Sequence, residues 1–387
     1  MPRCFGFSSL LLVGVPALAS AQSVDRAGYV VRLGADTIAI ERFTRSASRL
    51  EGDVAVRVPN GRLVHYVAAL SPEGRVTKFE LTLRPAAPGP NAAKPARGTM
   101  ELRGDSAITV VTIGDSTRTL RVGSGARAVP FAGMAHGMFE QAVMQARRAG
   151  GDSVSFNWVG IGAAEPSPSY VVRRGPDSVA VGFFGTPMLI RTDPAGRLLA
   201  LDGRLTTQKV LVDRVVDPGY DRFAADLVRR EREGHGMGPL SQRDTVRATV
   251  GPAHLTIDYG RPQRRGREIF GTVVPWDQVW RTGANAATQF ETDADLMVNG
   301  KTIPKGRYTL FTVPTRTGGE LIVNRQTGQW GTEYDGSQDL VRLPLRAEML
   351  QAPVDTFTIA VDPAAQGGVL RLRWDRTEYS LPFTVAQ

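Results

Sequence analysis

The chain has 387 residues, more than twice the length of a typical domain, and 42% of them are hydrophobic. Two folded domains are therefore expected, and a disordered chain is disfavoured. Charged residues make up 22% of the sequence, which argues against a protein that fills a membrane. The formal net charge is +9, but the basic residues are scattered singly and form no nucleic-acid-binding module, so no nucleic-acid partner is expected. The 42 glycines and 25 prolines favour short strands joined by turns.

The first 21 residues are typical of a secretory signal peptide. Arg3 supplies a positive charge, residues 5–18 are apolar, and residues 19–21 form an A-x-A cleavage pattern. We expect a mature chain that begins at Gln22, is periplasmic or secreted, and keeps no transmembrane segment. A retained membrane anchor is the alternative, which Pro16 disfavours because it breaks the apolar stretch.

The single cysteine, Cys4, lies within this expected signal peptide. A cysteine-free mature chain excludes disulfides, thiolate catalysis and cysteine-ligated metal centres. Its stability must then come from packing.

Residues 22–218 are predicted to form an antiparallel β-meander domain with an internal repeat. Short runs of alternating apolar and polar residues dominate this region, as in Thr37–Phe43. The segment Tyr29–Ile40 returns as Tyr170–Val181, with a Gly-x-Asp turn at the same place in both copies. This repeat indicates two similar meander units in one sheet.

One helix is expected within this domain, between Gly133 and Gly150, where apolar residues recur at helical spacing. A helix packed across a curved sheet resembles the half-barrel carriers of the bacterial envelope, which hold a lipid between sheet and helix; the resemblance is one of architecture alone. His136 has only Glu140 as a neighbouring metal ligand, so a surface or packing role is favoured over metal binding.

Residues 219–244 are predicted to contain a second helix and a linker. The helix is expected to begin with Asp221 as its N-cap and to end before Gly234. The glycine-rich run Gly234–Pro239 is not preceded by a strand and is not followed by Lys-Ser or Lys-Thr, so it is interpreted as a linker and not as a phosphate-binding loop.

Residues 245–387 are predicted to form a β-sandwich or jelly-roll-like domain, because short strand patterns alternate with turn signals. A hairpin is predicted over Leu296–Ile303, where Asn299-Gly300 supplies a type I′ turn. The chain as a whole is therefore expected to be mainly β.

Several motifs of this second domain resemble a bacterial family catalogued as domain of unknown function 2911. They are Tyr259-Gly260-Arg261-Pro262, Arg265-Gly266-Arg267-Glu268-Ile269-Phe270-Gly271, Val279-Trp280-Arg281-Thr282-Gly283-Ala284-Asn285-Ala286-Ala287-Thr288, Pro304-x-Gly306-x-Tyr308-x-Leu310-Phe311 and Trp330-Gly331-Thr332. The resemblance covers roughly residues 245–387 and leaves the N-terminal region unmatched. It implies an exported β-rich domain of unestablished activity, with no catalytic residue to transfer.

The candidate ligand-binding residues are Tyr259, Arg261, Arg281, Asn285 and Trp330. Arg281 carries a permanent charge and a rigid fork of donors, so near a core it needs a carboxylate, carbonyl groups or a ligand anion. The functional interpretation is a site for a small anion or a sugar, with tryptophan faces for a ring. The structural alternative is that Arg281 and Asn285 tie a long loop to the sheet through backbone carbonyls.

Catalytic patterns are weak. His254 is accompanied by no G-x-S-x-G sequence. A carboxylate pair such as Glu291 with Asp293 would face the same side of a strand, which suits a metal or glycosidase site, but such pairs are common on solvated faces. A noncatalytic binding module of the envelope, for an anionic or polyhydroxylated ligand, is the leading hypothesis, and no cofactor or metal is indicated. A hydrolase acting on envelope or extracellular material and a scaffold without ligand are the alternatives.

Overall fold

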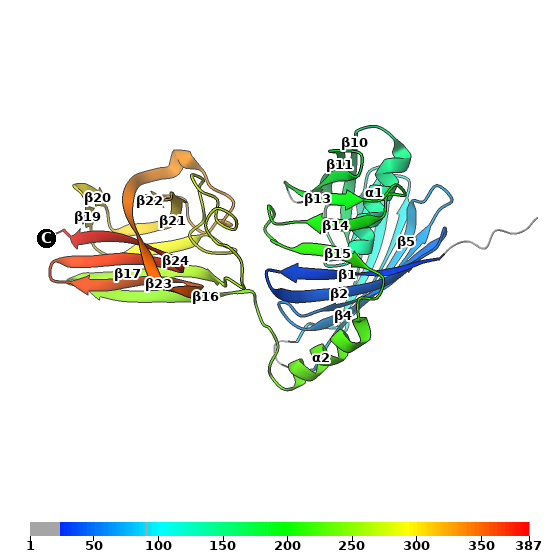
Figure 1. Ribbon diagram of the computed structural model, residues 1–387, viewed down its shortest axis with the longest axis horizontal. Coiled ribbons are helices and arrows are strands. Elements are labelled where there is room, and N and C mark those ends of the chain that lie inside the picture. Colours follow the sequence, from blue (N-terminus) through cyan, green and yellow to red (C-terminus); the bar gives the residue numbers. More distant parts are fainter. Residues whose placement is uncertain (1–23, 90–91, 184, 387) are drawn as a thin grey trace, which may run out of the picture.

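The computed structural model describes residues 24–89, 92–183 and 185–386. The expected signal peptide, Cys4 and the expected mature start at Gln22 lie outside this described part. The predicted mainly β fold is confirmed: two large sheets account for most of the described chain, one formed by β1–β15 and the other by β16–β24 (Figure 1). Within the described part, neither α-helix is long and apolar enough to cross a bilayer.

The N-terminal sheet contains fifteen strands, and β9 and β10 are its only parallel neighbours among the described residues. Strands β1–β8 are Asp25–Leu33, Asp36–Arg45, Arg49–Val56, Arg62–Leu70, Val76–Pro85, Ala96–Arg103, Ser106–Ile113 and Ser116–Gly123. Strands β9–β15 are Ala128–Phe131, Ser153–Gly160, Ser167–Arg173, Ser178–Phe183, Thr186–Thr192, Leu198–Asp202 and Leu211–Val215.

The order of these strands follows the chain around a strongly curled sheet. β1 pairs with both β2 and β15, so the first and last strands meet in the middle of the sheet, while β8 and β9 form its two edges. Only residues 124–127 connect β8 to β9, and so short a segment spans at most about 17 Å. The two edges must therefore lie near each other. A Cβ on Gly98 of β6 would lie 2.4 Å from the Ile161 side chain, which follows β10 and confirms this proximity.

The two copies of the sequence repeat form two hairpins of this sheet, β1–β2 and β11–β12. The first hairpin closes directly between Leu33 and Asp36, whereas the second needs the longer connection 174–177. The predicted meander is thus confirmed, and each copy of the repeat forms one hairpin of it.

Helix α1, His136–Ala149, lies inside the curve of the sheet, and helix α2, Tyr220–Arg232, lies on its outer face (Figure 1). Met138, Phe139 and Val143 of α1 belong to the same buried core as the inward-facing residues of the strands. On the outside, Phe223 and Leu227 of α2 cover Ile40 and Ala55. Strand β2 is therefore buried on both faces, and the alternation of apolar and polar residues fails there for this reason.

The expected N-cap of α2 is wrong by two positions. The helix follows Gly219, which has a φ of 66°, and no side chain caps it. Asp221 instead lies in the first turn, where its carboxylate forms an ion pair with Arg42 of β2 at 2.9 Å. Pairing with the sheet outweighs capping at this position.

A buried polar network attaches α1 to the sheet, with Glu140 at its centre. The Glu140 carboxylate is completely buried and accepts hydrogen bonds from Tyr29 Oη at 2.7 Å and Leu198 N at 2.9 Å. It also forms ion pairs with Arg214 at 2.6 Å and Arg45 at 3.2 Å. The two arginine side chains are themselves only 11% and 10% exposed; Glu140 is the carboxylate partner of Arg45, and Arg214 also pairs with Asp25 at 2.5 Å.

Glu41 of β2 is a second buried carboxylate in the same region. It accepts hydrogen bonds from Tyr66 Oη at 2.5 Å and from the backbone N–H groups of His136 and Gly137, the first residues of α1. Burial nevertheless raises the pKa of Glu41 to about 7. His136 lies in the core beside Tyr29 and Phe139, where burial lowers its pKa to about 4.

The C-terminal part is one nine-stranded antiparallel sheet that folds back on itself around an apolar core. Its strands are β16 Ser241–Val250, β17 Ala253–Pro262, β18 Thr288–Thr292, β19 Leu296–Val298, β20 Lys301–Ile303, β21 Gly306–Pro314, β22 Gly318–Asn324, β23 Asp339–Ala364 and β24 Gly367–Val385, with a short 3-10 helix at Gly336–Gln338. The long strands β23 and β24 shift register near Met349 and Val354 and contribute to both layers. The sandwich expected from the sequence is therefore made by one continuous sheet.

The predicted hairpin over Leu296–Ile303 is confirmed as β19 and β20. Asn299 and Gly300 between them have φ values of 49° and 78°, as a type I′ turn requires.

Residues 233–240 carry the chain from α2 to β16 without a helix or strand. The division into domains at residues 219–244 stays a prediction. The two sheets are in direct contact through the β1–β2 turn: Ala35 N donates to Arg265 O at 3.0 Å, and Asp36 forms an ion pair with the Arg265 side chain at 2.5 Å.

Candidate functional site

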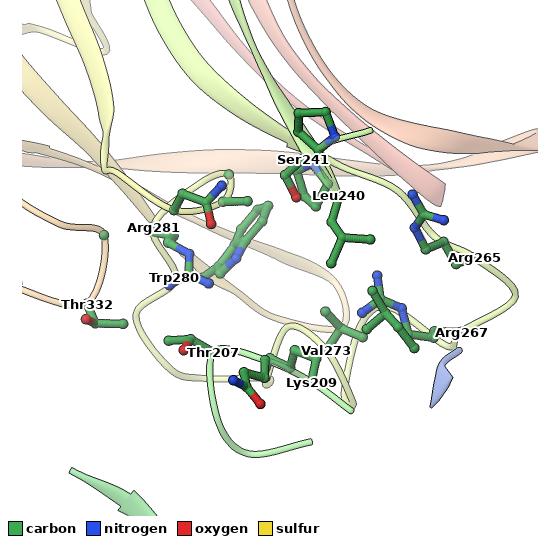
Figure 2. Close-up of a pocket in the computed structure, with 18 of the residues that line it drawn as sticks. Thr207, Lys209, Leu240, Ser241, Arg265, Arg267, Val273, Trp280, Arg281 and Thr332 are labelled. Atoms are coloured by element: carbon green, nitrogen blue, oxygen red, sulfur yellow. The ribbon is translucent and has the colours of Figure 1, made fainter. Parts of the chain in front are cut away.

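A pocket of about 770 Å³ lies where the two sheets approach each other (Figure 2). The N-terminal part contributes Arg62 and Lys209 to its lining, and the C-terminal part contributes Arg265, Arg267 and Arg281. None of the described residues that line this pocket is an aspartate or glutamate. A cavity lined by one sign of charge is suited to an anionic ligand.

The loop that carries most of the C-terminal residues of this site runs from β17 to β18, over residues 263–287. It is fixed to β21 because Trp280 and Thr312 exchange two backbone hydrogen bonds, of 2.7 and 2.8 Å. It also lies tightly against β17: a Cβ on Gly260 would lie 2.1 Å from the Ala284 carbonyl oxygen. Its side chains are therefore presented to the pocket from a fixed backbone.

Arg281 lines the pocket without a hydrogen bond or ion pair to any described residue, and its Nε is buried without a partner. Burial lowers the pKa of its guanidinium. Gly331 leaves room for the Arg281 side chain, since a Cβ there would lie 2.2 Å from Arg281 Cδ. The half-buried guanidinium has no partner among the described residues, so its N–H groups are available to a ligand.

Lys209 approaches the pocket from the connection between β14 and β15, in a left-handed backbone conformation with a φ of 57°. Its pKa is lowered, first by burial and then by the charges of Arg281 and Arg267. The pKa of Arg267 is lowered as well, by burial and then by Arg265. The charges of these side chains thus repel one another across the pocket.

The remaining cations of the pocket have partners in the protein. Arg265 pairs with Asp36, and Arg62 donates to the Val58 carbonyl oxygen at 2.6 Å. Arg267 donates to the carbonyl oxygens of Arg264 and Gln263, at 3.0 and 2.5 Å, which leave its charge uncompensated. Arg265 is therefore the one lining cation with a carboxylate partner within the described structure, while Arg62, Lys209, Arg267 and Arg281 have none.

An aromatic wall adjoins these charges. Trp280 lines the pocket and stacks on Trp374, with ring centroids 5.9 Å apart and planes 17° apart, and its edge meets Phe357. Figure 2 shows Trp280 and Arg281 on one side of the pocket and Arg265 and Arg267 on the other. An apolar ring and an anionic group can therefore bind side by side.

The structure does not bring the five candidates from the sequence into one site. Arg281 and Asn285 line the pocket, whereas Tyr259 and Arg261 do not. Tyr259 is buried in the core and its Oη accepts a hydrogen bond from Ile359 N at 3.0 Å. Arg261 forms an ion pair with Asp244 at 2.9 Å. Trp330 is 45% exposed and precedes the lining residue Gly331 without lining the pocket itself.

Sequence reasoning missed Lys209 and Arg62, because both come from the other sheet. One signal for Lys209 was present: it is one of only five lysines among 47 basic residues and follows a short polar run between two strand patterns.

The groups considered for catalysis lie elsewhere. His254 Nδ1 is 2.8 Å from a carboxylate oxygen of Asp293, and Glu291 pairs with Arg307 at 3.3 Å. None of these residues lines the pocket that contains Arg281. Across the described residues, no group of three or more His, Cys, Asp or Glu side chains is arranged to hold a metal ion.

The C-terminal part of the chain matches a protein family of unknown function. Residues 241–383 match the family described as "Protein of unknown function (DUF2911)". The resemblance predicted from the sequence motifs is thereby confirmed, and the N-terminal region matches no family model. The match contains the loop that carries Arg281 and Asn285, while Lys209 and Arg62 lie outside it.

No curated protein matches the sequence. Among solved structures, a DUF1089 family protein from Pseudomonas aeruginosa is similar at 9% identity, over 51% of this chain and 95% of that chain, with a TM-score of 0.30. The similarity is low in both sequence and structure.

Proposed function

We propose that this protein is a noncatalytic binding module of the bacterial envelope, whose ligand carries an anionic or polyhydroxylated group. The observation that carries this proposal is the unpartnered Arg281 guanidinium in a pocket lined by five basic residues and, within the described structure, no carboxylate. A half-buried cation without a counterion is partly desolvated, and a bound anion would offset the free energy that this costs. The Trp280 face beside it suits a ring on the same ligand.

The two alternatives make different demands on this pocket. A scaffold role would require backbone carbonyl groups that accept hydrogen bonds from Arg281. No described residue accepts a hydrogen bond from its side chain. A hydrolase needs a nucleophile or a general base near the ligand, but His254, Glu291 and Asp293 lie outside this pocket. These observations favour binding.

Replacing Arg281 with lysine is expected to weaken binding of phenyl phosphate, a ring with one anionic group, by about tenfold or more, because lysine keeps the charge but loses the planar fork. Isothermal titration calorimetry on the full chain measures this change. Arg307→Lys is the matched control: Arg307 is exposed on β21 outside the pocket, and its replacement should leave the affinity unchanged.

The outcome of this experiment separates the proposed roles. Under the scaffold alternative, Arg281→Lys would lower the free energy of unfolding by about 2–5 kcal/mol and no ligand would bind in either form. Binding of phenyl glucoside, but not phenyl phosphate, would assign the pocket to a sugar and not to an anion.

Export is the second part of the proposal and rests on the signal-peptide pattern of the first 21 residues. Amino-terminal sequencing of the protein from the envelope fraction should give Gln22 as the first residue. Cytoplasmic protein that begins with Met1 would contradict this part alone.

A further inference from the structure

We propose that the pocket binds a dianionic head group of the phosphomonoester class, held jointly by Lys209 from the N-terminal sheet and by Arg267 and Arg281 from the C-terminal loop, with an apolar ring of the same ligand against Trp280. This inference rests on the proposed function and adds to it the charge of the ligand and the part that the N-terminal sheet plays in binding.

The pocket lining contains more positive charge than the protein neutralises. Of the five basic residues in the pocket lining, Arg265 is neutralised by Asp36, and Arg62 donates to a carbonyl of its own turn. Arg62, Lys209, Arg267 and Arg281 thus have no carboxylate partner within the described structure, and Lys209 and Arg281 have no hydrogen-bond acceptor there either. A single negative charge would leave a larger excess of positive charge in the pocket than two negative charges would. A phosphate monoester carries nearly two negative charges at neutral pH and three strong acceptor oxygens.

The cations of the pocket come from both sheets. Lys209 belongs to the connection between β14 and β15, while Arg267 and Arg281 belong to the loop between β17 and β18. Burial lowers the pKa of Lys209, and the charges of Arg281 and Arg267 lower it further. Lys209 and the two arginines therefore repel each other across the pocket, whereas a dianion bound between them would attract all three.

The backbone at Lys209 has an unusual conformation. Residues with a side chain seldom adopt a positive φ, and Lys209 holds one of 57° beside the pocket. Thr207 and Gln208 line the same pocket, so three consecutive residues of this connection face it. Such strain is found where the surrounding structure requires one side-chain position.

Two probes with the same ring test the charge of the ligand. Phenyl phosphate at pH 8 is a dianion, and benzenesulfonate is a monoanion with a head group of similar tetrahedral shape. Calorimetric titration of the full chain should give an affinity for phenyl phosphate at least about tenfold higher than for benzenesulfonate. Equal affinities would overturn the inference without affecting the proposed anion site.

A lysine variant tests the contribution of the N-terminal sheet. Lys209→Met keeps the Cβ and the backbone conformation but removes the charge, so it should lower the affinity for phenyl phosphate about tenfold and bring it close to that for benzenesulfonate. Lys305→Met, at an exposed lysine outside the pocket, is the matched control and should change neither value. Thermal unfolding of both variants checks that they are folded.

The failures of the two proposals are distinguishable. If Lys209→Met binds phenyl phosphate as tightly as the unmodified chain, the C-terminal loop binds the anion alone and the inference is wrong, although Arg281 keeps its role. If neither probe binds to the unmodified chain, the proposed anion site is wrong and the inference fails with it.

Discussion

Replacing Glu140 with leucine is expected to lower the free energy of unfolding by about 3–5 kcal/mol, because it removes one partner of a buried ion network. The carboxylate is completely buried and satisfies two arginines, Arg45 and Arg214, as well as the Tyr29 hydroxyl. Without it, Arg45 loses its only carboxylate partner and Arg214 keeps only Asp25, at 2.5 Å, while both guanidinium groups stay largely buried in the N-terminal sheet. Urea-induced unfolding at pH 7, followed by circular dichroism, measures the loss.

A surface glutamate supplies the matched control. Glu101 pairs with Arg103 at 2.6 Å, but both side chains are exposed, so Glu101→Leu should change the free energy of unfolding by less than about 1 kcal/mol. A loss below about 1 kcal/mol for Glu140→Leu as well would show that α1 is held by its apolar face and not by this network.

The second large effect is a pair of opposite pH dependences of the folding stability, caused by Glu41 and His136, that cancel each other in the unmodified chain. The pKa of Glu41 is raised to about 7 in the folded protein, above its ordinary value of 4.5. Its contribution to stability is therefore fully present below pH 4.5 and is lost as the pH rises to about 7. The pKa of His136 is lowered from 6.5 to about 4, so its contribution is present above pH 6.5 and is lost as the pH falls toward 4.

Each contribution amounts to about 3 kcal/mol for a shift of this size, and the two pH ranges nearly coincide. We therefore expect these two residues to contribute almost no net change in the stability of the unmodified chain between pH 4 and pH 7. Glu41→Gln should leave a stability that increases with pH over this range, and His136→Asn one that decreases. Chemical unfolding of the three proteins at several pH values measures these slopes.

Parallel stability curves for all three proteins would contradict this account. If only the His136→Asn curve were flat, the hydrogen bonds to Glu41 from Tyr66 and from the first residues of α1 would keep its pKa near the ordinary value despite burial. The nearby charge of Glu140, which raises the pKa of Glu41, belongs to the same balance.

Local patterns predicted the elements of this fold well. The helix between Gly133 and Gly150, the Asn299-Gly300 hairpin and the repeated meander all depend on contacts between residues close in sequence, and all are present. The cap of α2 was mispredicted because the Asp221 carboxylate forms a tertiary ion pair with Arg42. The burial of both faces of β2 was not foreseen either, since only the packing of α2 causes it.

The site was predicted only in part, for a related reason. Arg281 and Asn285 were identified from their loop, and they line the pocket. Tyr259 and Arg261 share the same stretch of sequence but lie in the core and in a separate ion pair. Lys209 reaches the pocket only because the two sheets are in contact, and no pattern within one segment encodes such an arrangement.

The curled order of the N-terminal sheet also determines how many of its strand edges could pair with another chain. Fifteen strands leave just two open edges, β8 and β9, because β1 and β15 pair in the middle. Unpaired edges are templates for joining other chains. The β8 edge carries Arg118 and Arg121 on a largely exposed strand, and β9 is only four residues long and contains Pro130, which has no N–H to donate. Charge protects one edge from intermolecular strand pairing, and shortness with proline protects the other, so a sheet of this size can remain free of amyloid-like growth.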